Sequence, residues 1–255
     1  MPVLFVGHGS PMNAIEDNPW SRGFASLHGV VPRPTAILAV SAHWYVDGTF
    51  LTAEGAPRTI HDFGGFPPAL HAVEYPAPGR ADLAARVREL IGERAGLRTD
   101  WGLDHGTWSV LCHMYPDADV PVVQLSIDRR LAPAAHLELA RSLTALRHEG
   151  VLILGSGNIT HNLRDAFGRM RTGSSETPDW ARRFDALVRG ALDDHDTSAI
   201  VMADQSDDGR MAHPTPDHWL PLIYALGASD RDDAVSYPIE GFDAGSLSMR
   251  AVRWG

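Results

Sequence analysis

Several apolar, strand-like runs in this chain each lead directly into a short Gly- or Pro-marked turn that carries a histidine. The runs and their histidines are 2–7 with His8, 35–42 with His43, and 150–155 with His161. Continuous β-branched and aliphatic runs of this kind are typical of parallel strands that are buried on both faces. In open α/β sheets, ligands bind in the crevice beyond the carboxyl ends of the strands. We therefore expect the three imidazoles to meet at one edge of a sheet.

The rest of the chain alternates strand-like and helix-like segments without an internal repeat. Further strands are expected over 120–127, at an edge over 49–53, and in one or two closing strands over 233–253. Helices are expected over 18–29, 80–95, 108–114, 131–148, 178–194 and 215–226, and a long functional loop over 57–78. This alternation predicts an α/β fold with a central, mostly parallel sheet flanked by helices and a metal site at the C-terminal edge of the strands. The length of 255 residues suits one domain spanning 1–255.

Composition excludes several classes of function. A net charge of -10 and scattered basic residues argue against binding to nucleic acid or to an anionic membrane. No apolar stretch approaches the length of a membrane span, and the N-terminus lacks the features of a signal peptide. Cys112 is the one cysteine, so an internal disulfide and a thiolate zinc cluster are both impossible. We expect a cytoplasmic protein, and no pattern in the sequence indicates an oligomeric state.

The histidines indicate a metal site when they are taken together. Neutral imidazole is the commonest protein ligand for metals such as iron and zinc. His8 lies between two glycines, so the backbone there is free to approach an ion closely. The segment HPTPDHW adds His213 and His218. Any one of these residues alone would more often be an ordinary hydrogen-bonded histidine, but their joint occurrence after strand-like runs favours metal binding.

Other segments are candidates for the surroundings of that site. Asp104-His105-Gly106 is a polar triplet in a turn, and HDFGGFP over 61–67 has the glycines and aromatic residues of a lid. Asn158 and Asn162 flank His161 and are candidates for orienting it or binding substrate. Aromatic walls are expected from Phe63, Phe66, Trp44 and Trp108. The nucleophile elbow, the dinucleotide-binding glycine motif and the phosphate-binding P-loop are absent from the sequence.

Six motifs, found in the same order over nearly the whole chain, resemble those of the class III extradiol ring-cleavage dioxygenases. They are GHGSPM at 7–12, SAHW at 41–44, HDFGGFP at 61–67, DHGTW at 104–108, GSGNITHNL at 155–163 and HPTPDHWLPL at 213–222. The similarity is strongest to the DOPA 4,5-dioxygenase branch of that family. It implies an α/β fold with a non-haem metal at the edge of a central sheet.

The resemblance also implies roles for individual residues. His8, His43 and His218 match metal ligands, while His161 matches a histidine that serves either as an acid/base or as an additional ligand. His105 matches a second acid/base position. Substrate contacts are expected from His61, Asp62, Phe66, Asn158 and His213. Better-known members complete the ligand set with a glutamate where this chain has His218. We therefore expect Fe(II) for activity and Zn(II) as a metal that the isolated protein can also bind, because imidazole suits both.

The expected activity is opening of a catechol ring, with a DOPA-like diol and O₂ as substrates and a semialdehyde as product. One alternative is a zinc hydrolase that uses a metal-bound hydroxide, since three imidazoles and an open position would generate one near neutral pH. The other alternative is a metal-binding module without catalysis. Dependence on oxygen separates the first two hypotheses, because a hydrolase works equally well under nitrogen. Nothing in the sequence identifies the catechol or the ring bond that is cleaved.

Overall fold

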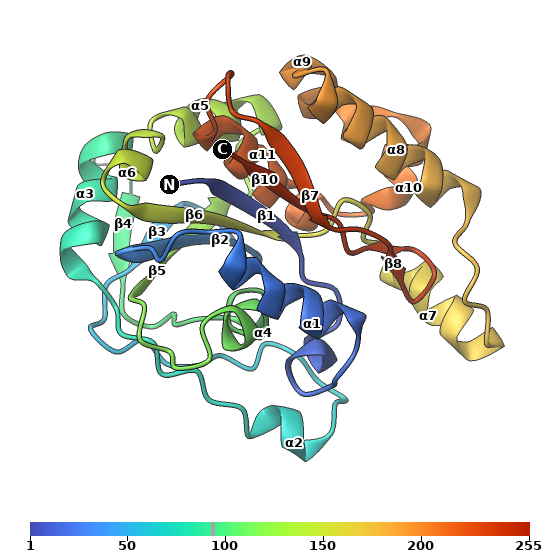
Figure 1. The fold of residues 1–255 in the computed structure, drawn as a ribbon, viewed down its shortest axis with the longest axis horizontal. Helices are drawn as coiled ribbons and strands as arrows, with labels where there is room; N and C mark the ends of the chain where they lie inside the picture. Colours follow the sequence, from blue (N-terminus) through green and yellow to red (C-terminus); the bar gives the residue numbers. More distant parts are fainter. Residues whose placement is uncertain (93–94) are drawn as a thin grey trace.

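An eight-stranded sheet forms the centre of the computed structural model, which describes residues 1–92 and 95–255 (Figure 1). Its strands are β1 (Val3–Gly7), β2 (Ala36–Val46), β3 (Thr49–Thr52), β4 (Ala95–Arg98), β5 (Val122–Asp128), β6 (Val151–Gly157), β7 (Val235–Ile239) and β10 (Ala251–Trp254). They are ordered β4-β3-β5-β2-β6-β1-β10-β7. The four strands β5, β2, β6 and β1 run parallel, whereas β10 and β7 pair antiparallel at one end. The prediction of a mostly parallel central sheet flanked by helices is confirmed. A separate hairpin joins β8 (Phe242–Asp243) to β9 (Leu247–Ser248).

Helices cover both faces of the sheet. The α-helices are α1 (Pro19–Ser26), α2 (Pro68–His71), α3 (Ala81–Ile91), α4 (His105–Met114), α5 (Pro133–Arg141), α6 (Ala145–His148), α7 (Leu163–Thr172), α8 (Asp179–Asp193), α9 (Thr197–Met202), α10 (Asp207–Ala212) and α11 (Leu220–Ala228). Short 3₁₀ helices are η1 (Pro11–Ala14), η2 (Leu27–Gly29), η3 (Ala203–Gln205) and η4 (Pro216–His218). In Figure 1, α1 and α4 lie on one side of the sheet and α5 and α11 on the other. Among the described residues, no helix has both the length and the apolar character that crossing a membrane requires.

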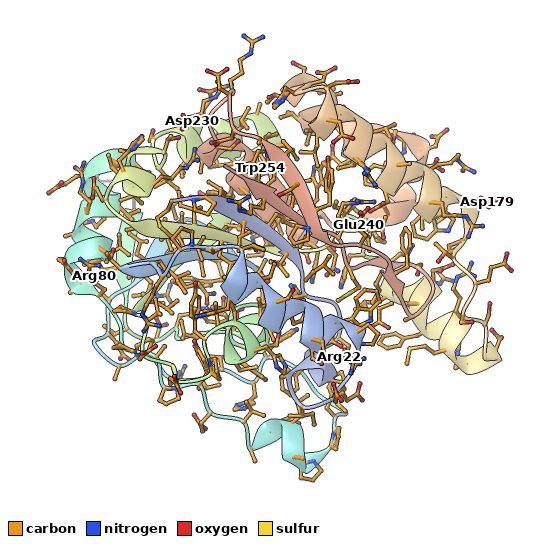
Figure 2. All side chains as sticks on the ribbon, in the orientation of Figure 1. Arg22, Arg80, Asp179, Asp230, Glu240 and Trp254 are labelled. Atoms are coloured by element: carbon orange, nitrogen blue, oxygen red, sulfur yellow. The ribbon has the colours of Figure 1, made fainter. Side chains whose placement is uncertain are left out.

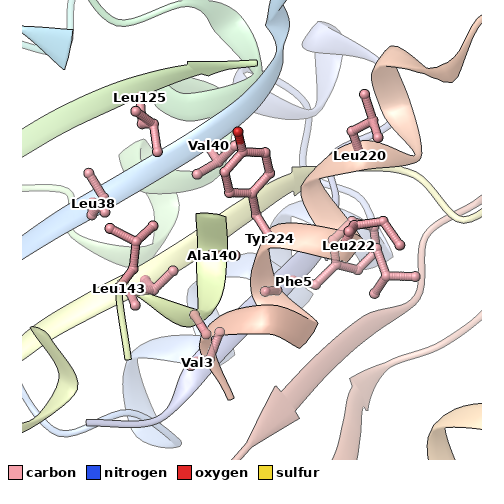
Figure 3. Close-up of a cluster of buried hydrophobic side chains, with 14 of the residues drawn as sticks. Val3, Phe5, Leu38, Val40, Leu125, Ala140, Leu143, Leu220, Leu222 and Tyr224 are labelled. Atoms are coloured by element: carbon pink, nitrogen blue, oxygen red, sulfur yellow. The ribbon is translucent and has the colours of Figure 1, made fainter. Parts of the chain in front are cut away.

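Alternate side chains of the central strands build two apolar layers, one on each face of the sheet. Val3, Phe5, Leu38 and Val40 belong to the layer under α5 and α11, where Tyr224 packs among them (Figure 3). Leu4, Val6, Ile37 and Ala39, the intervening residues, belong to the layer under α1 and α4. The side chains of a strand alternate between faces, so a strand buried on both faces must be apolar throughout. The sheet is thereby fixed as a rigid base for the loops at its edge.

The register of the parallel strands places the predicted histidines at one edge. Gly7 of β1 lies beside Gly157 of β6, and Ser41 of β2 lies beside Ser156. The chain continues from these positions into the segments that carry His8, His43 and His161. Their convergence therefore follows from the register of three parallel strands, of which β1 and β6 end at this level and β2 passes through it.

Several predicted elements differ from those in the structure. His43 lies inside β2 rather than in a turn after it, because the strand continues to Val46 across a register shift between Val40 and Tyr45. The helix expected over 108–114 begins at His105, because the Asp104 side chain accepts a hydrogen bond from the Thr107 backbone and caps it. The helix expected over 131–148 is split into α5 and α6.

The remaining differences concern short elements. The helix expected over 80–95 ends at Ile91, and its positions 93–94 lie outside the described residues. The helix expected over 215–226 is divided into η4 and α11, with His218 closing η4. Four α-helices and one strand were not predicted: α2, α7, α9, α10 and β4. Their sequences are short or rich in polar residues and glycine, so packing against neighbouring elements rather than local propensity stabilises them.

Candidate metal centre

His8 and His43 aim their rings at a common point. Their Nε2 atoms lie 3.1 Å apart. On the opposite side of the His8 ring, Nδ1 is within 3.0 Å of the Ser156 hydroxyl, which itself donates to the Gly106 carbonyl. The Nδ1 atom of His43 lies 3.1 Å from a carboxylate oxygen of Asp62. Both rings are therefore held through Nδ1, which directs Nε2 towards the centre of the site.

Asp62 connects two of the histidines. One of its oxygens lies 2.9 Å from Nδ1 of His105 and also accepts a hydrogen bond from the His105 backbone at 3.0 Å. Its other oxygen contacts His43, and the ring centroids of His43 and His105 are 3.8 Å apart. The neighbouring Asp104 does not hold His105, since it caps α4 instead. Asp62 was predicted to contact substrate, but in the structure its carboxylate orients two imidazoles.

His218 and His161 form a stacked pair beside these rings. Their centroids are 3.4 Å apart and their planes differ by 4°. The His218 centroid also lies 5.2 Å from that of His8 and 5.0 Å from that of His43. Nδ1 of His218 is hydrogen-bonded to the carboxylate of Asp217. The structure thus brings together the five histidines to which the sequence assigned metal or acid/base roles.

This donor set fits a divalent metal ion. One ligand atom each from His8, His43 and His105 lies within 4.8 Å of the others. Two nitrogens that bind one tetrahedral zinc at about 2.0–2.1 Å are about 3.3 Å apart, which is close to the 3.1 Å between His8 and His43. Nitrogen-only sites suit zinc and iron alike. His105 therefore competes geometrically with His218 for the third position in the ligand set.

Burial favours the neutral form of four of these five imidazoles. It lowers the pKa of His8 and of His218 well below the ordinary value, and the neighbouring imidazoles lower each further. Burial also lowers the pKa of His161 to about 3 and that of His105 to about 4. Burial acts in the same direction on His43, but the hydrogen bond to Asp62 and the nearby carboxylates outweigh it and raise the pKa of His43. Burial alone would raise the pKa of Asp62, yet hydrogen bonds with His105 and His43 hold it well below its usual range. The imidazoles that burial keeps neutral can bind a cation without first losing protons.

A cavity of about 710 Å³ opens above these rings. Its floor includes the five clustered histidines, and Phe63 and Phe66 from the 61–67 segment form part of its wall. Trp44 and Trp108, which were expected to line it, are not among the lining residues. Trp44 is buried and stacks on Trp101, while Trp108 is buried and donates from its indole to the Ile60 carbonyl. The aromatic lining therefore comes from this loop, from Trp20 of α1 and from Phe167 of α7, rather than from the sheet or from α4.

Three residues predicted to bind substrate do not line the cavity. Nε2 of His61 lies 3.0 Å from the Val73 carbonyl. Asn158 is buried, and its side chain links the backbone of Gly9 to that of Ser248. His213 is also buried, with Nε2 2.8 Å from the carbonyl of Ile159. Through these contacts the three side chains hold the loops around the site. Phe66 and Asp62, which were also predicted to bind substrate, do line the cavity.

Comparison with known proteins gives a family match over nearly the whole chain. A model of the catalytic LigB subunit of aromatic ring-opening dioxygenase matches residues 3–244. The chain belongs to this family. Over its whole length it is 47% identical to a 4,5-DOPA dioxygenase extradiol of Escherichia coli K12, of which it covers 95%. It is 36% identical to the Beta vulgaris protein of the same name, over 99% of this chain and 96% of that protein.

A solved structure agrees with this assignment. An uncharacterized protein from Escherichia coli K12 superimposes with a TM-score of 0.87 at 43% identity, and the match covers 100% of both chains. The resemblance to class III extradiol dioxygenases is therefore confirmed, and the protein is an enzyme of the oxidoreductase class.

One wall of the cavity in this family member was not expected from the sequence. It is formed by α7, whose Leu163, Phe167 and Met170 line the cavity and are exposed. Their spacing of four and three residues is the signal that would have found this helix, because it places them on one face. The sequence analysis predicts no element between His161 and 178, so the apolar face of α7 is a finding of the structure.

Gly157 allows a close approach on which the site depends. A Cβ at this position would lie 2.3 Å from the backbone oxygen of His218. We expect Gly157→Ala to lower the free energy of unfolding by about 1–3 kcal/mol, because η4 must move away from β6. Urea unfolding measures this change. As a control, Gly190→Ala on α8 adds a Cβ into open space and is expected to be neutral or to stabilise by up to about 1 kcal/mol. Equal stability of the two variants would contradict the prediction.

Proposed function

We propose that this enzyme opens the ring of a catechol with O₂ to give a semialdehyde, and that it uses Fe(II) and DOPA-like catechols. The observation that carries this proposal is the convergence of five imidazoles at the floor of a largely apolar cavity. The names of the relatives point to the same substrate, since the two described above are 4,5-DOPA dioxygenases. We expect the enzyme to work in the cytoplasm on small aromatic diols.

We assign the metal to His8, His43 and His218. Each has Nδ1 held by a neighbouring group, namely Ser156, Asp62 and Asp217 respectively. Such partners fix the tautomer that leaves Nε2 free for a metal. A bound Fe(II) would supply positions for both substrate oxygens and for O₂. A shell made only of imidazoles suits zinc equally well, so we expect that the isolated protein can also hold Zn(II).

The two remaining histidines are proposed to move protons. His161 stacks on His218 and lines the cavity, where its ring nitrogen would take the proton of the second catechol hydroxyl. His105 receives its orientation from Asp62, and its Nε2 would return a proton to the oxygen that leaves during ring opening. General acid–base groups must lie within hydrogen-bond reach of the reacting oxygen, and these rings flank the proposed metal position. Phe63 and Phe66 would keep bulk water away from the opened intermediate.

The test is an aerobic assay after anaerobic loading with Fe(II). When air and DOPA are added, we expect a yellow semialdehyde chromophore and uptake of one O₂ for each catechol consumed. The same protein loaded with Zn(II), and the Fe(II) protein kept under nitrogen, serve as matched controls and should stay colourless. If the fully Fe(II)-loaded enzyme consumes no oxygen with any catechol, the proposal is wrong. The family match favours ring opening over the zinc-hydrolase alternative, because the chain belongs to the ring-opening dioxygenases.

A further inference from the structure

Among the described residues, the side chains that line the cavity include carboxylates but neither lysine nor arginine. The chain has no lysine, and no arginine in the described part of the chain lines the cavity. Three acidic residues do line it: Asp62, Glu16 and Asp243. The charge of Asp62 is directed to two imidazoles, as described above. Glu16 and Asp243 are left to act on whatever fills the cavity.

Elsewhere on the surface, charged side chains of both signs project side by side (Figure 2), and many carboxylates are paired with arginine. Arg22 pairs at 2.5 Å with Asp17, the residue next to Glu16. In the described part of the chain, no arginine bonds to Glu16, whose carboxylate accepts only from the Asn18 amide at 3.4 Å. Exposed carboxylates are charged at neutral pH. Glu16 therefore presents an uncompensated negative charge.

Asp243, which also lines the cavity, has a similar setting. Its carboxylate accepts a hydrogen bond from the next backbone amide, that of Ala244, at 2.8 Å. Nearby arginines are engaged with other groups: Arg250 and Arg189 both bind Glu240. Arg169, which packs near the β8–β9 turn, binds Asp165 and the Glu176 carbonyl. No salt bridge to Asp243 is found among the described residues.

The exposures of these residues indicate how a substrate lies. His8, His105 and His218 are each at most 5% exposed, so they form the deep end of the cavity. Glu16 is exposed and Asp243 half-buried, so both lie towards its mouth. A catechol whose two oxygens reach the imidazoles therefore directs its ring substituent towards these two carboxylates. Between them lie apolar walls, which weaken solvent screening and strengthen the effect of each charge.

We infer that Glu16 and Asp243 select catechols whose substituent ends in a cationic amine, and that a carboxylate on this substituent is not required. This inference rests on the proposed function. The N-terminal ends of α1 and α7 also face the cavity through Pro19 and Leu163, and helix N-termini favour anions. Several of their leading amides are already occupied, because Asn18 accepts from the Trp20 and Ser21 amides of α1 and Asn162 accepts from the Asp165 amide of α7. These caps reduce the number of donors that a carboxylate on the substrate meets at the two ends.

The experiment compares three catechols with the Fe(II)-loaded enzyme: dopamine, which carries only an amine; DOPA, which carries both groups; and 3,4-dihydroxyphenylacetate, which carries only a carboxylate. We expect kcat/KM for dopamine to be at least equal to that for DOPA, and to exceed it by no more than about threefold. We expect kcat/KM for dihydroxyphenylacetate to be about 10–100-fold lower than that for dopamine. Glu16→Gln and Asp243→Asn should each lower the ratio of kcat/KM for dopamine to that for dihydroxyphenylacetate by about 3–10-fold. High salt should lower this ratio as well. Asp232→Asn removes an exposed carboxylate that does not line the cavity, so it should leave the ratio of kcat/KM for the two substrates unchanged.

Anaerobic titration calorimetry of the same catechols gives a second readout that needs no turnover. The inference is supported, even if no ring is opened, when dihydroxyphenylacetate binds more weakly than dopamine and this difference in affinity is smaller in the Glu16→Gln/Asp243→Asn double variant. In that case the proposed function alone fails. Equal binding and turnover of the amine and the acid would overturn the inference while leaving ring cleavage intact. A loss of more than about tenfold on going from DOPA to dopamine would overturn it too, because the carboxylate would then be required.

Discussion

Replacing His218 with alanine is expected to abolish stoichiometric metal binding and to reduce ring-cleavage turnover by at least about 10³-fold. The reason is that His8 and His43 would be left as a pair, with their Nε2 atoms 3.1 Å apart and no third ligand from η4. Metal content after dialysis, followed by turnover with added Fe(II), measures both effects. His148→Ala, which removes an exposed histidine, controls for imidazoles that bind metal non-specifically.

The matched variant His105→Ala separates a ligand from an acid/base group. It is expected to keep one metal ion per chain while its turnover falls by about 10²–10⁴-fold, the range typical of losing a general acid or base. Both variants are needed because His105, rather than His218, completes the closest group of ligand atoms with His8 and His43. If His105→Ala loses the metal and His218→Ala retains it, the two assignments must be exchanged.

The sequence predicts the sheet and most of the histidine cluster for one reason. Strand, turn and histidine are adjacent in the chain, and parallel strands bring their ends to one level. His8 and His161 follow their strands as expected, and the register between β1 and β6 brings them to the same edge. His43 reaches this edge from within β2, because a register shift after Val40 lets the strand continue past the histidine.

What the sequence does not reveal depends on contacts between distant residues. Asp62 and His105 are separated by 43 positions, and no local pattern indicates that one carboxylate serves two imidazoles. The same is true of Asn158, whose amide joins Gly9 to Ser248 across the core. Side chains that support the site and side chains that line the cavity are of the same polar types, so the sequence does not distinguish them. The structure shows that His61, Asn158 and His213 lie behind the lining, whereas Asp62 both lines the cavity and orients two imidazoles.

Asp62→Asn is expected to lower turnover by about 10–100-fold and to weaken metal binding, the usual cost of removing a group that orients a ligand. The wild-type carboxylate accepts from Nδ1 of His43 through one oxygen and from His105 through the other. An asparagine side chain has nearly the same shape, but its amide group donates and cannot accept a second imidazole N–H. One of the two rings must therefore lose its orientation or change its tautomer.

Asp62→Ala removes both hydrogen bonds and is expected to have the larger effect. The control is Asp47→Asn, which removes an exposed carboxylate paired with Arg129 and should preserve turnover. Turnover and metal affinity are measured for all three variants, with thermal unfolding to check that each is folded. A merely structural role would lower the melting temperature but leave the turnover of the folded, metal-loaded fraction unchanged. An Asp62→Asn enzyme with wild-type turnover per bound metal would show that the link between His43 and His105 has no part in the reaction.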